Sequence, residues 1–163
     1  MGMLARRNWS AANGGGLPGF SLIELLAALA IMSLLLALAV PAYHGHIVRA
    51  KRVQGQAALL RLMQQQERYY SQNNHYLAFS SASPAPPFPW WSGDGPAASA
   101  AASAYEIEAL ACPGMTIGQC VLLRAMPGTS KVDAQFQDAD CGILSLSSTG
   151  QRGSSGPAVH CWP

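Results

Sequence analysis

Charged residues are scarce in this chain. Only 11% of its 163 residues are Asp, Glu, Lys or Arg, and the formal net charge is +2. So low a charge content excludes a disordered polyelectrolyte. Without residues 1–19, which hold Arg6 and Arg7, eight basic residues remain against eight acidic ones. A neutral remainder gives no electrostatic footprint for DNA or RNA, so nucleic acid as a partner is possible but unsupported by charge.

The sequence also lacks the motifs of common catalytic and metal sites. HExxH, GxSxG and the P-loop are all missing. His44 and His46 are two residues apart, so on a helix they point to different sides and cannot chelate one metal ion. Asp133, Asp138 and Asp140 lack the spacing of an EF-hand loop, and we interpret them as solvated turn residues. We therefore predict a protein that is not an enzyme, with no catalytic residue, no metal site and no cofactor.

Cysteine is limited to four residues in the last third of the chain, with no CxxC pair: Cys112, Cys120, Cys141 and Cys161. The even count favours two disulfides in an oxidising compartment. The alternative is four reduced, buried thiols in a cytosolic protein. Four cysteines allow three connectivities, and their spacing alone does not choose among them.

One long apolar run, residues 20–40, dominates the N-terminal part of the chain. Leu, Ala, Ile and Met favour a helix, and this run would span about 31 Å, close to the thickness of a bilayer core. Gly and Pro in residues 14–19 break helices, so the helix should begin near Phe20. The run contains one charge, Glu24, and a carboxylate near the centre of a membrane helix costs about 2.5–3.5 kcal/mol.

Two ordinary interpretations of this run are a secretory signal peptide and a plain single-span anchor. In the first, Arg6 and Arg7 form the basic region and residues 37–39 (Ala-Leu-Ala) form the cleavage site. Neither interpretation explains an acid four residues after the Gly19–Phe20 junction. The positive-inside rule places Arg6 and Arg7 in the cytoplasm, although basic residues also follow the run. The cysteines place the C-terminal part outside the cytoplasm.

The segment Gly19-Phe20-Ser21-Leu22-Ile23-Glu24-Leu25-Leu26 resembles the processing signature of the type IV pilin family. The resemblance implies that a prepilin peptidase/methyltransferase cuts between Gly19 and Phe20 and then methylates the new amine of Phe20. Pro41 is similar to a helix-bending proline of that family. The implied partners are this enzyme, the inner membrane, other pilin subunits and the pilus assembly machinery. In a fibre, Glu24 of one subunit could then neutralise the amine of a neighbour, because charges attract strongly in a low dielectric.

The helical pattern resumes after Pro41, where a kink is expected, and continues over residues 43–70. Val53, Ala57 and Leu60 share one stripe, and Leu59, Leu62, Met63 and Tyr70 lie beside it. Together these residues predict a helix with one buried side. The other faces are predicted to carry the basic residues Arg49, Lys51, Arg52, Arg61 and Arg68. A helix from Phe20 to residue 71 would be about 78 Å long, which suits a spine whose first half lies in a membrane or fibre core.

The rest of the chain predicts a long loop and then a sheet. Residues 71–103 contain five prolines and an Ala/Ser tract, which favour a loop. Within it, Trp90 and Trp91 are predicted to pack on the sheet rather than lie exposed at a subunit contact. Strand patterns follow at residues 105–110, 121–125, 131–136 and 142–146. Short turns between strands imply an antiparallel sheet, hence an α+β fold.

Two further segments resemble type IV pilins. Residues 67–76 are similar to the end of the spine helix in PilE-like minor pilins. Residues 141–162 resemble the family's disulfide-closed C-terminal loop, which implies a Cys141–Cys161 bond and leaves Cys112 to pair with Cys120. The implied protein is a long helix packed on about four antiparallel strands, divided into a cleaved leader (1–19), a transmembrane or fibre-core helix (20–42) and a head domain (43–163).

The resemblance therefore predicts a structural subunit of a type IV pilus, in particular a minor pilin. Its implied roles are pilus biogenesis, adhesion, twitching motility or DNA uptake. The implied location is the bacterial inner membrane, in a single pass with a periplasmic C-terminus, followed by the extracellular fibre. The alternative is a pseudopilin of a type II secretion system, a group that shares the leader but generally lacks the C-terminal disulfide loop.

Overall fold

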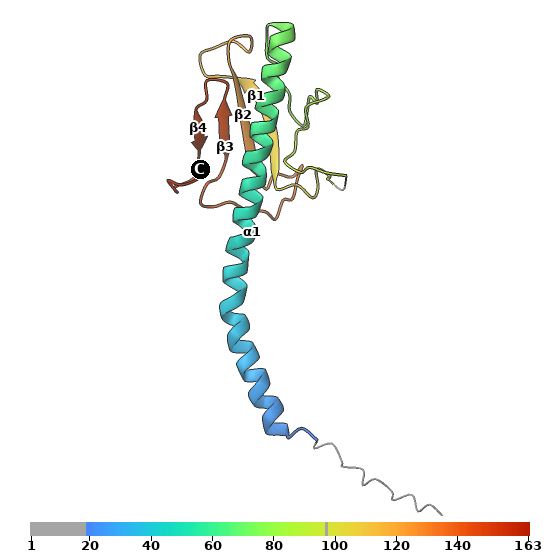
Figure 1. Ribbon diagram of the computed structural model, residues 1–163, viewed down its shortest axis with the longest axis vertical. Helices are drawn as coiled ribbons and strands as arrows, with labels where there is room; N and C mark the ends of the chain where they lie inside the picture. Colours follow the sequence, from blue (N-terminus) through green and yellow to red (C-terminus); the bar gives the residue numbers. More distant parts are fainter. Residues whose placement is uncertain (1–18, 97) are drawn as a thin grey trace, which may run out of the picture. The chain divides into compact units, whose positions relative to one another are not determined.

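The structure, a computed structural model, describes residues 19–96 and 98–163, so the predicted leader lies outside the described residues apart from Gly19. One helix precedes four strands (Figure 1): α1 (Leu22–Asn73), β1 (Tyr105–Ala111), β2 (Val121–Pro127), β3 (Leu144–Ser147) and β4 (Arg152–Ser154). The chain forms two compact units that meet after Pro41. We call the described part of the first unit, residues 19–41, the stem, and the second unit, residues 42–163, the head.

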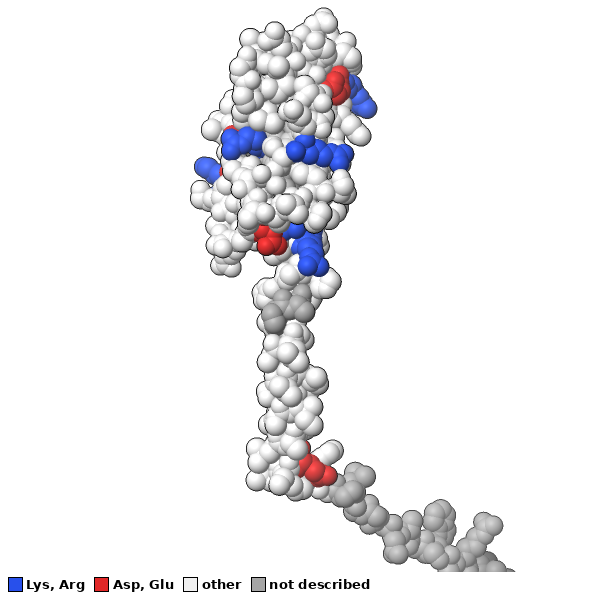
Figure 2. Space-filling model, turned by 90° about the vertical axis from the view of Figure 1, so that its left-hand side faces the viewer, with Lys and Arg blue, Asp and Glu red and all other residues white. Residues whose placement is uncertain are grey.

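The stem is the N-terminal part of α1 and carries almost no charge. It contributes the one helix, among the described residues, that is long and apolar enough to cross a membrane. Figure 2 shows its surface uncharged except for one acidic group near its N-terminal end. α1 is helical through Pro41, whose side chain is not described. The predicted kink at Pro41 stays a prediction.

The head is a four-stranded antiparallel sheet in the order β1-β2-β3-β4, with α1 across one face (Figure 1). Alternation in β1 and β2 sends Ile107 and Leu123 into the core, where both are fully buried against Leu59 and Leu62 of α1. The predicted α+β fold, a long helix on an antiparallel sheet, is confirmed.

The prediction of the buried face of α1 is correct in part. Leu59 and Leu62 are buried as predicted, whereas Val53 is 61% exposed and Leu60 is 40% exposed. Gly55 and Gln66 are buried beside the two leucines. A Cβ at Gly55 would lie 2.8 Å from the ring of Tyr105, so glycine permits the close approach of helix and sheet. The Gln66 amide exchanges two hydrogen bonds with the backbone of Leu77, at 2.6 and 2.9 Å. Gly55 and Gln66 therefore help to determine which face of α1 packs on the sheet. Neither residue is apolar enough to be found from a hydrophobic pattern.

One predicted strand is absent, and one observed strand was not predicted. Residues 131–136 form turns, from which Val132 and Phe136 reach the core. The following strand, β3, begins two residues later than predicted, and β4 was missed because its sequence, Arg-Gly-Ser, has no apolar alternation. Between α1 and β1 the chain runs beside the sheet, with isolated bridges from Phe79 to Ala109 and from Trp91 to Glu106. Trp90 packs against the core as predicted.

Candidate functional site

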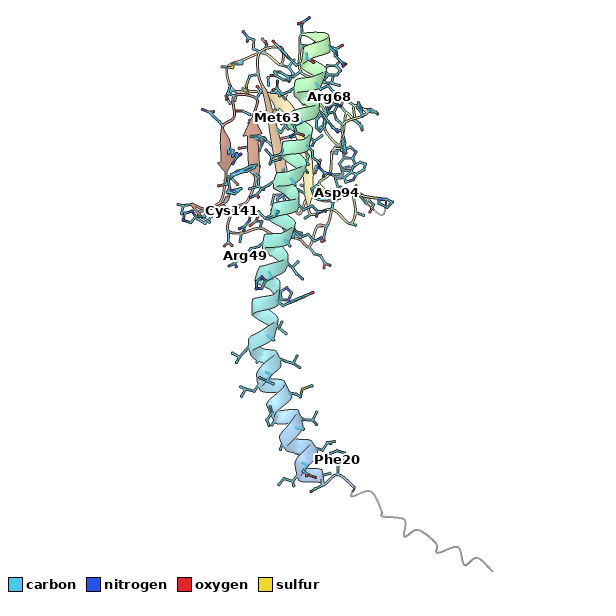
Figure 3. The ribbon with its side chains drawn as sticks, in the orientation of Figure 1. Phe20, Arg49, Met63, Arg68, Asp94 and Cys141 are labelled. Atoms are coloured by element: carbon cyan, nitrogen blue, oxygen red, sulfur yellow. A yellow bond between two sulfur atoms is a disulfide. The ribbon has the colours of Figure 1, made fainter. Side chains whose placement is uncertain are left out.

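The N-terminal end of α1 exposes the residues of the predicted cleavage site. Gly19 is exposed and Phe20 is 91% exposed (Figure 3). The backbone N–H of Ser21 donates a hydrogen bond to Oε2 of Glu24 at 2.9 Å. Ser21 is the residue before the helix, and Glu24 is the third residue of the helix. A glutamate at this position that accepts from the preceding N–H group is one half of a capping box, and its negative charge also lies at the positive end of the helix dipole. Glu24 thus caps its own helix in the uncut chain.

The stem presents apolar side chains in every direction. Its large apolar residues from Leu22 to Val40 are between 50% and 77% exposed, and Figure 3 shows side chains pointing outward all along this part of α1. An apolar surface of this extent is unstable in water and marks a membrane or protein contact. The stem is therefore built to be covered by something outside this chain.

A buried ion pair, which we call the Arg52 clamp, joins the head part of α1 to the turn before Cys141. Arg52 donates to both carboxylate oxygens of Asp138, through Nε at 2.8 Å and Nη2 at 2.6 Å. Tyr105 donates its hydroxyl to Asp138 at 2.7 Å, and the backbone N–H of Cys141 donates at 3.2 Å. The Asp138 side chain is fully buried and that of Arg52 is 12% exposed. Helix, strand and turn are thus tied through one carboxylate.

The clamp shifts the protonation equilibria of its three members. Burial alone would raise the pKa of Asp138, but hydrogen bonds from Arg52 and Tyr105 outweigh it and lower that pKa below its ordinary value. The pKa of Arg52 is raised, chiefly by its hydrogen bond to Asp138. The pKa of Tyr105 is also raised, first by burial and then by the same carboxylate. Asp138 is therefore ionised at neutral pH, and Arg52 and Tyr105 keep their protons.

Two disulfides link cysteines within the head. Cys141 bonds to Cys161, as the resemblance implied, and Cys112 bonds to Cys120. The side-chain amide of Gln56 donates to the carbonyl of Cys161 at 2.6 Å, so α1 also holds the C-terminal loop. The clamp and this disulfide meet at Cys141, which is fully buried (labelled in Figure 3). Helix α1 is thereby fixed to the C-terminal third of the chain.

The prediction for the acidic residues is correct in part. Asp140 is exposed and Asp133 is half-buried, but Asp138 is buried in the clamp, and Arg52 is not on a free face of the helix. Within the described residues, no group of three or more His, Cys, Asp or Glu side chains is placed to hold a metal ion. No local sequence pattern indicates the clamp, because its two charges are 86 residues apart.

The chain is similar to a family of known proteins and to solved structures. Residues 41–145 match the model of a family described as "Type IV minor pilin ComP, DNA uptake sequence receptor". Among solved structures, a type IV pilin from Shewanella oneidensis is 25% identical, with a TM-score of 0.43, over 71% of this chain and 98% of that one. The non-core minor pilin PilV of Neisseria meningitidis is 16% identical, with a TM-score of 0.46, over 71% and 94%. No curated protein sequence matches. Because the family match covers more than half of the chain, this protein belongs to the ComP family of type IV minor pilins and is a subunit of a type IV pilus.

Proposed function

We propose that this minor pilin is made as a prepilin and enters its fibre through the stem. The leader, residues 1–19, is removed by a prepilin peptidase between Gly19 and Phe20, and the same enzyme methylates the amine of Phe20. The observation that carries the proposal is the exposed apolar stem, which is long enough to cross a membrane. The Gly19–Phe20 bond lies directly before α1 and is exposed, as cleavage requires.

The location follows from the stem and the disulfides. Residues 20–42 would cross the inner membrane once and later lie in the fibre core, with Pro41 bending the helix as it leaves. Residues 43–163 would form the head in the periplasm, where both disulfides can form. Assembly machinery and other pilin subunits would then move the chain into the extracellular fibre. The role is structural, without enzymatic activity.

The mature N-terminus tests this proposal. In protein purified from the native membrane, mass spectrometry of the N-terminal peptide should find Phe20 as the first residue, carrying one methyl group. Gly19→Val should abolish the cut, because the branched side chain fills the position next to the scissile bond, while Gly16→Val should leave it intact. A chain that starts at Val40 would instead indicate a secreted protein, and an uncut chain a plain anchor; either result overturns the proposal.

DNA uptake is a second candidate role, favoured by the description of the matching family. On the face shown in Figure 2, Lys and Arg lie in small separate groups over the head and form no continuous patch. Three arginines are already paired with acids: Arg52, Arg61 and Arg124. The other five basic residues have no ion pair among the described residues: Arg49, Lys51, Arg68, Lys131 and Arg152. Direct phosphate contacts would accordingly be few.

Salt dependence measures that number of contacts. Full-length protein in detergent should bind duplex DNA, with log K falling against log salt at a slope no steeper than about −4.5, since each phosphate contact contributes about −0.9. Replacing both Arg68 and Lys131 with alanine should flatten the slope, while Arg61→Ala, in a residue already paired, should leave it unchanged. Undetectable binding at about 50 mM salt would exclude the DNA role and leave the structural role untouched.

A further inference from the structure

The head contains a pocket between α1 and the loop that leads to β1, with a volume of about 300 Å³. We call it the Trp91 pocket. Its apolar wall combines side chains of both segments: Ala58, Leu62, Pro89 and Trp91. Three polar side chains also line it: Arg61, Gln65 and Asp94. Sites for small ligands combine apolar walls with a few polar groups in this way, and this volume accepts one substituted six-membered ring.

Both walls of the Trp91 pocket are held by the fold. The four lining residues of α1 lie on one side of the helix, because positions three and four apart are neighbours there. On the opposite wall, the N–H of Gly93 donates to Oγ of Ser103 at 3.1 Å, just before β1 begins. Asp94, labelled in Figure 3, follows directly on the same loop. The pocket is therefore largely preformed, which lowers the entropy lost on binding a ligand.

Trp91 is the largest side chain that lines the pocket, and it is half-buried. Its ring meets that of Trp90 edge to face, with centroids 5.1 Å apart and planes at 84°. Trp90 itself packs against the core, so this contact holds the indole of Trp91 in place. A second hollow of about 320 Å³, lined by prolines and aromatic rings, shares Pro89 and Trp91 with the first. Trp91 thus lines two adjoining hollows on the surface of the head.

The polar side chains of the pocket have unused hydrogen-bonding groups. Nη1 of Arg61 donates to Oδ2 of Asp94 at 2.7 Å, and this is the one hydrogen bond that either side chain makes among the described residues. The other guanidinium N–H groups and Oδ1 of Asp94 remain available to a ligand. The exposed amide of Gln65, which is both a donor and an acceptor, makes no hydrogen bond within residues 19–96 and 98–163. The pocket therefore offers donors and acceptors side by side, and its two charges balance.

We propose that the Trp91 pocket binds a neutral pyranose unit of a carbohydrate. A pyranose has an apolar face of C–H groups that packs on an indole, and hydroxyls that each donate and accept hydrogen bonds. A purely apolar ligand would remove water from Arg61 and Asp94 without replacing its hydrogen bonds. A charged ligand would be attracted by one member of this pair and repelled by the other. The second hollow beside Trp91 would take the next unit of a longer chain.

The inference goes beyond the proposed function, because it concerns the head and not its route into the fibre. Binding of a sugar by the purified protein and incorporation into a fibre are separate measurements. A protein that binds no sugar would still be a pilus subunit, and one that is not cut after Gly19 would still present the pocket.

Saturation-transfer NMR with the full-length protein tests the proposal, in a detergent whose head group is not a sugar. The probes are the methyl glycosides of glucose, galactose, mannose and N-acetylglucosamine, and a disaccharide of each sugar. At least one monosaccharide should bind with a Kd of about 1–10 mM and receive saturation mainly at the C–H protons of one ring face. Its disaccharide should bind at least about threefold tighter. No binding of any probe at about 50 mM would overturn the proposal.

Variants then locate the binding site. Trp91→Ala should weaken binding of the sugar by at least about tenfold, and Trp91→Phe, which keeps an aromatic face, should recover most of it. The matched control is Trp162→Ala, which removes another half-buried tryptophan of the head outside both hollows and should leave the Kd unchanged. Asp94→Ala changes an exposed ion pair with little effect on folding, and should still weaken binding by about fivefold.

Two results would contradict this location and this ligand. Equal Kd values for Trp91→Ala and Trp162→Ala, or a wild-type Kd for Asp94→Ala, would place the sugar elsewhere and overturn the proposal. Aromatic grooves also bind proline-rich peptides, so a decaproline peptide is titrated in parallel. Binding of that peptide in the absence of binding by any sugar would assign the pocket to peptide recognition instead.

Discussion

Replacing Arg52 with alanine is expected to lower the free energy of unfolding of the head by about 3–5 kcal/mol. The variant leaves the carboxylate of Asp138 buried, with the hydroxyl of Tyr105 and one backbone N–H as its remaining donors. A buried charge that loses its partner costs far more than the pair contributed, because the solvation lost on folding is no longer offset. The loss should also loosen the turn before Cys141, which this carboxylate holds.

The matched control is Arg61, which pairs with Asp94 at a similar distance, 2.7 Å. Both of those side chains are about half exposed, so Arg61→Ala should cost about 1 kcal/mol or less. Denaturant unfolding of the processed full chain in detergent measures both values through tryptophan fluorescence. After removal of the leader every tryptophan lies in the head: Trp90, Trp91 and Trp162. Equal losses for the two variants would show that the clamp contributes no more than a surface pair.

Acid provides an independent measurement of the same clamp. The folded state lowers the pKa of Asp138, so this group stabilises the head above its unfolded pKa, about 3.9. The contribution is lost as pH falls below that value and through the lower folded pKa. Asp138→Asn should therefore be less stable than the wild type at neutral pH and lose less stability on acidification. A wild-type head whose stability is flat from pH 5 to about 2 would contradict the assignment.

Composition was sufficient to predict the stem and the strands with regular alternation. The stem needs only a long apolar helix, and β1 and β2 need only alternating side chains, since each is a local property. The polar strand β4 has no such pattern, and its pairing with β3 comes from the turn around Gly150, whose φ is +83°. The C-terminal disulfide could be inferred only by resemblance, because spacing does not fix connectivity.

The rotation of α1 about its axis could not be predicted, for a physical reason. The helix has two apolar faces, and its hydrophobic pattern alone cannot tell which one the sheet covers. Contacts of Gly55 with Tyr105 and of Gln66 with Leu77 determine which face the sheet covers. The first joins residues far apart in the sequence, and the second depends on a polar side chain, so neither belongs to the hydrophobic pattern. The Arg52 clamp could not be predicted either, because the sequence around a single Asp in a turn does not indicate that its side chain is buried. The hydrophobic pattern of α1 thus leaves undecided which of its two apolar faces the sheet covers.

Neutralising Glu24 is expected to lower incorporation into the fibre by at least about tenfold, equivalent to about 1.4 kcal/mol or more. In the proposed mature chain, Phe20 would bear a cationic amine one helical turn from this carboxylate. In a fibre core of low dielectric, an unpaired amine is costly and an opposite charge on a neighbouring stem offsets that cost. The observed hydrogen bond from Ser21 offers a second explanation, in which Glu24 only caps its own helix.

Two substitutions separate pairing between subunits from capping within one. Glu24→Gln keeps an oxygen that can accept the hydrogen bond from Ser21 but removes the charge, whereas Glu24→Ala removes both. If the charge acts between subunits, both variants lose incorporation to a similar degree, although mass spectrometry still finds Phe20 as the first residue. If the residue only caps the helix, Glu24→Gln assembles like the wild type and Glu24→Ala alone is weakened, by about 0.5–2 kcal/mol. Ser33→Ala, which removes a hydroxyl bonded to its own helix at Ala30, should assemble normally in either case. A fully incorporated Glu24→Gln would therefore exclude Glu24 as the partner of a neighbouring amine.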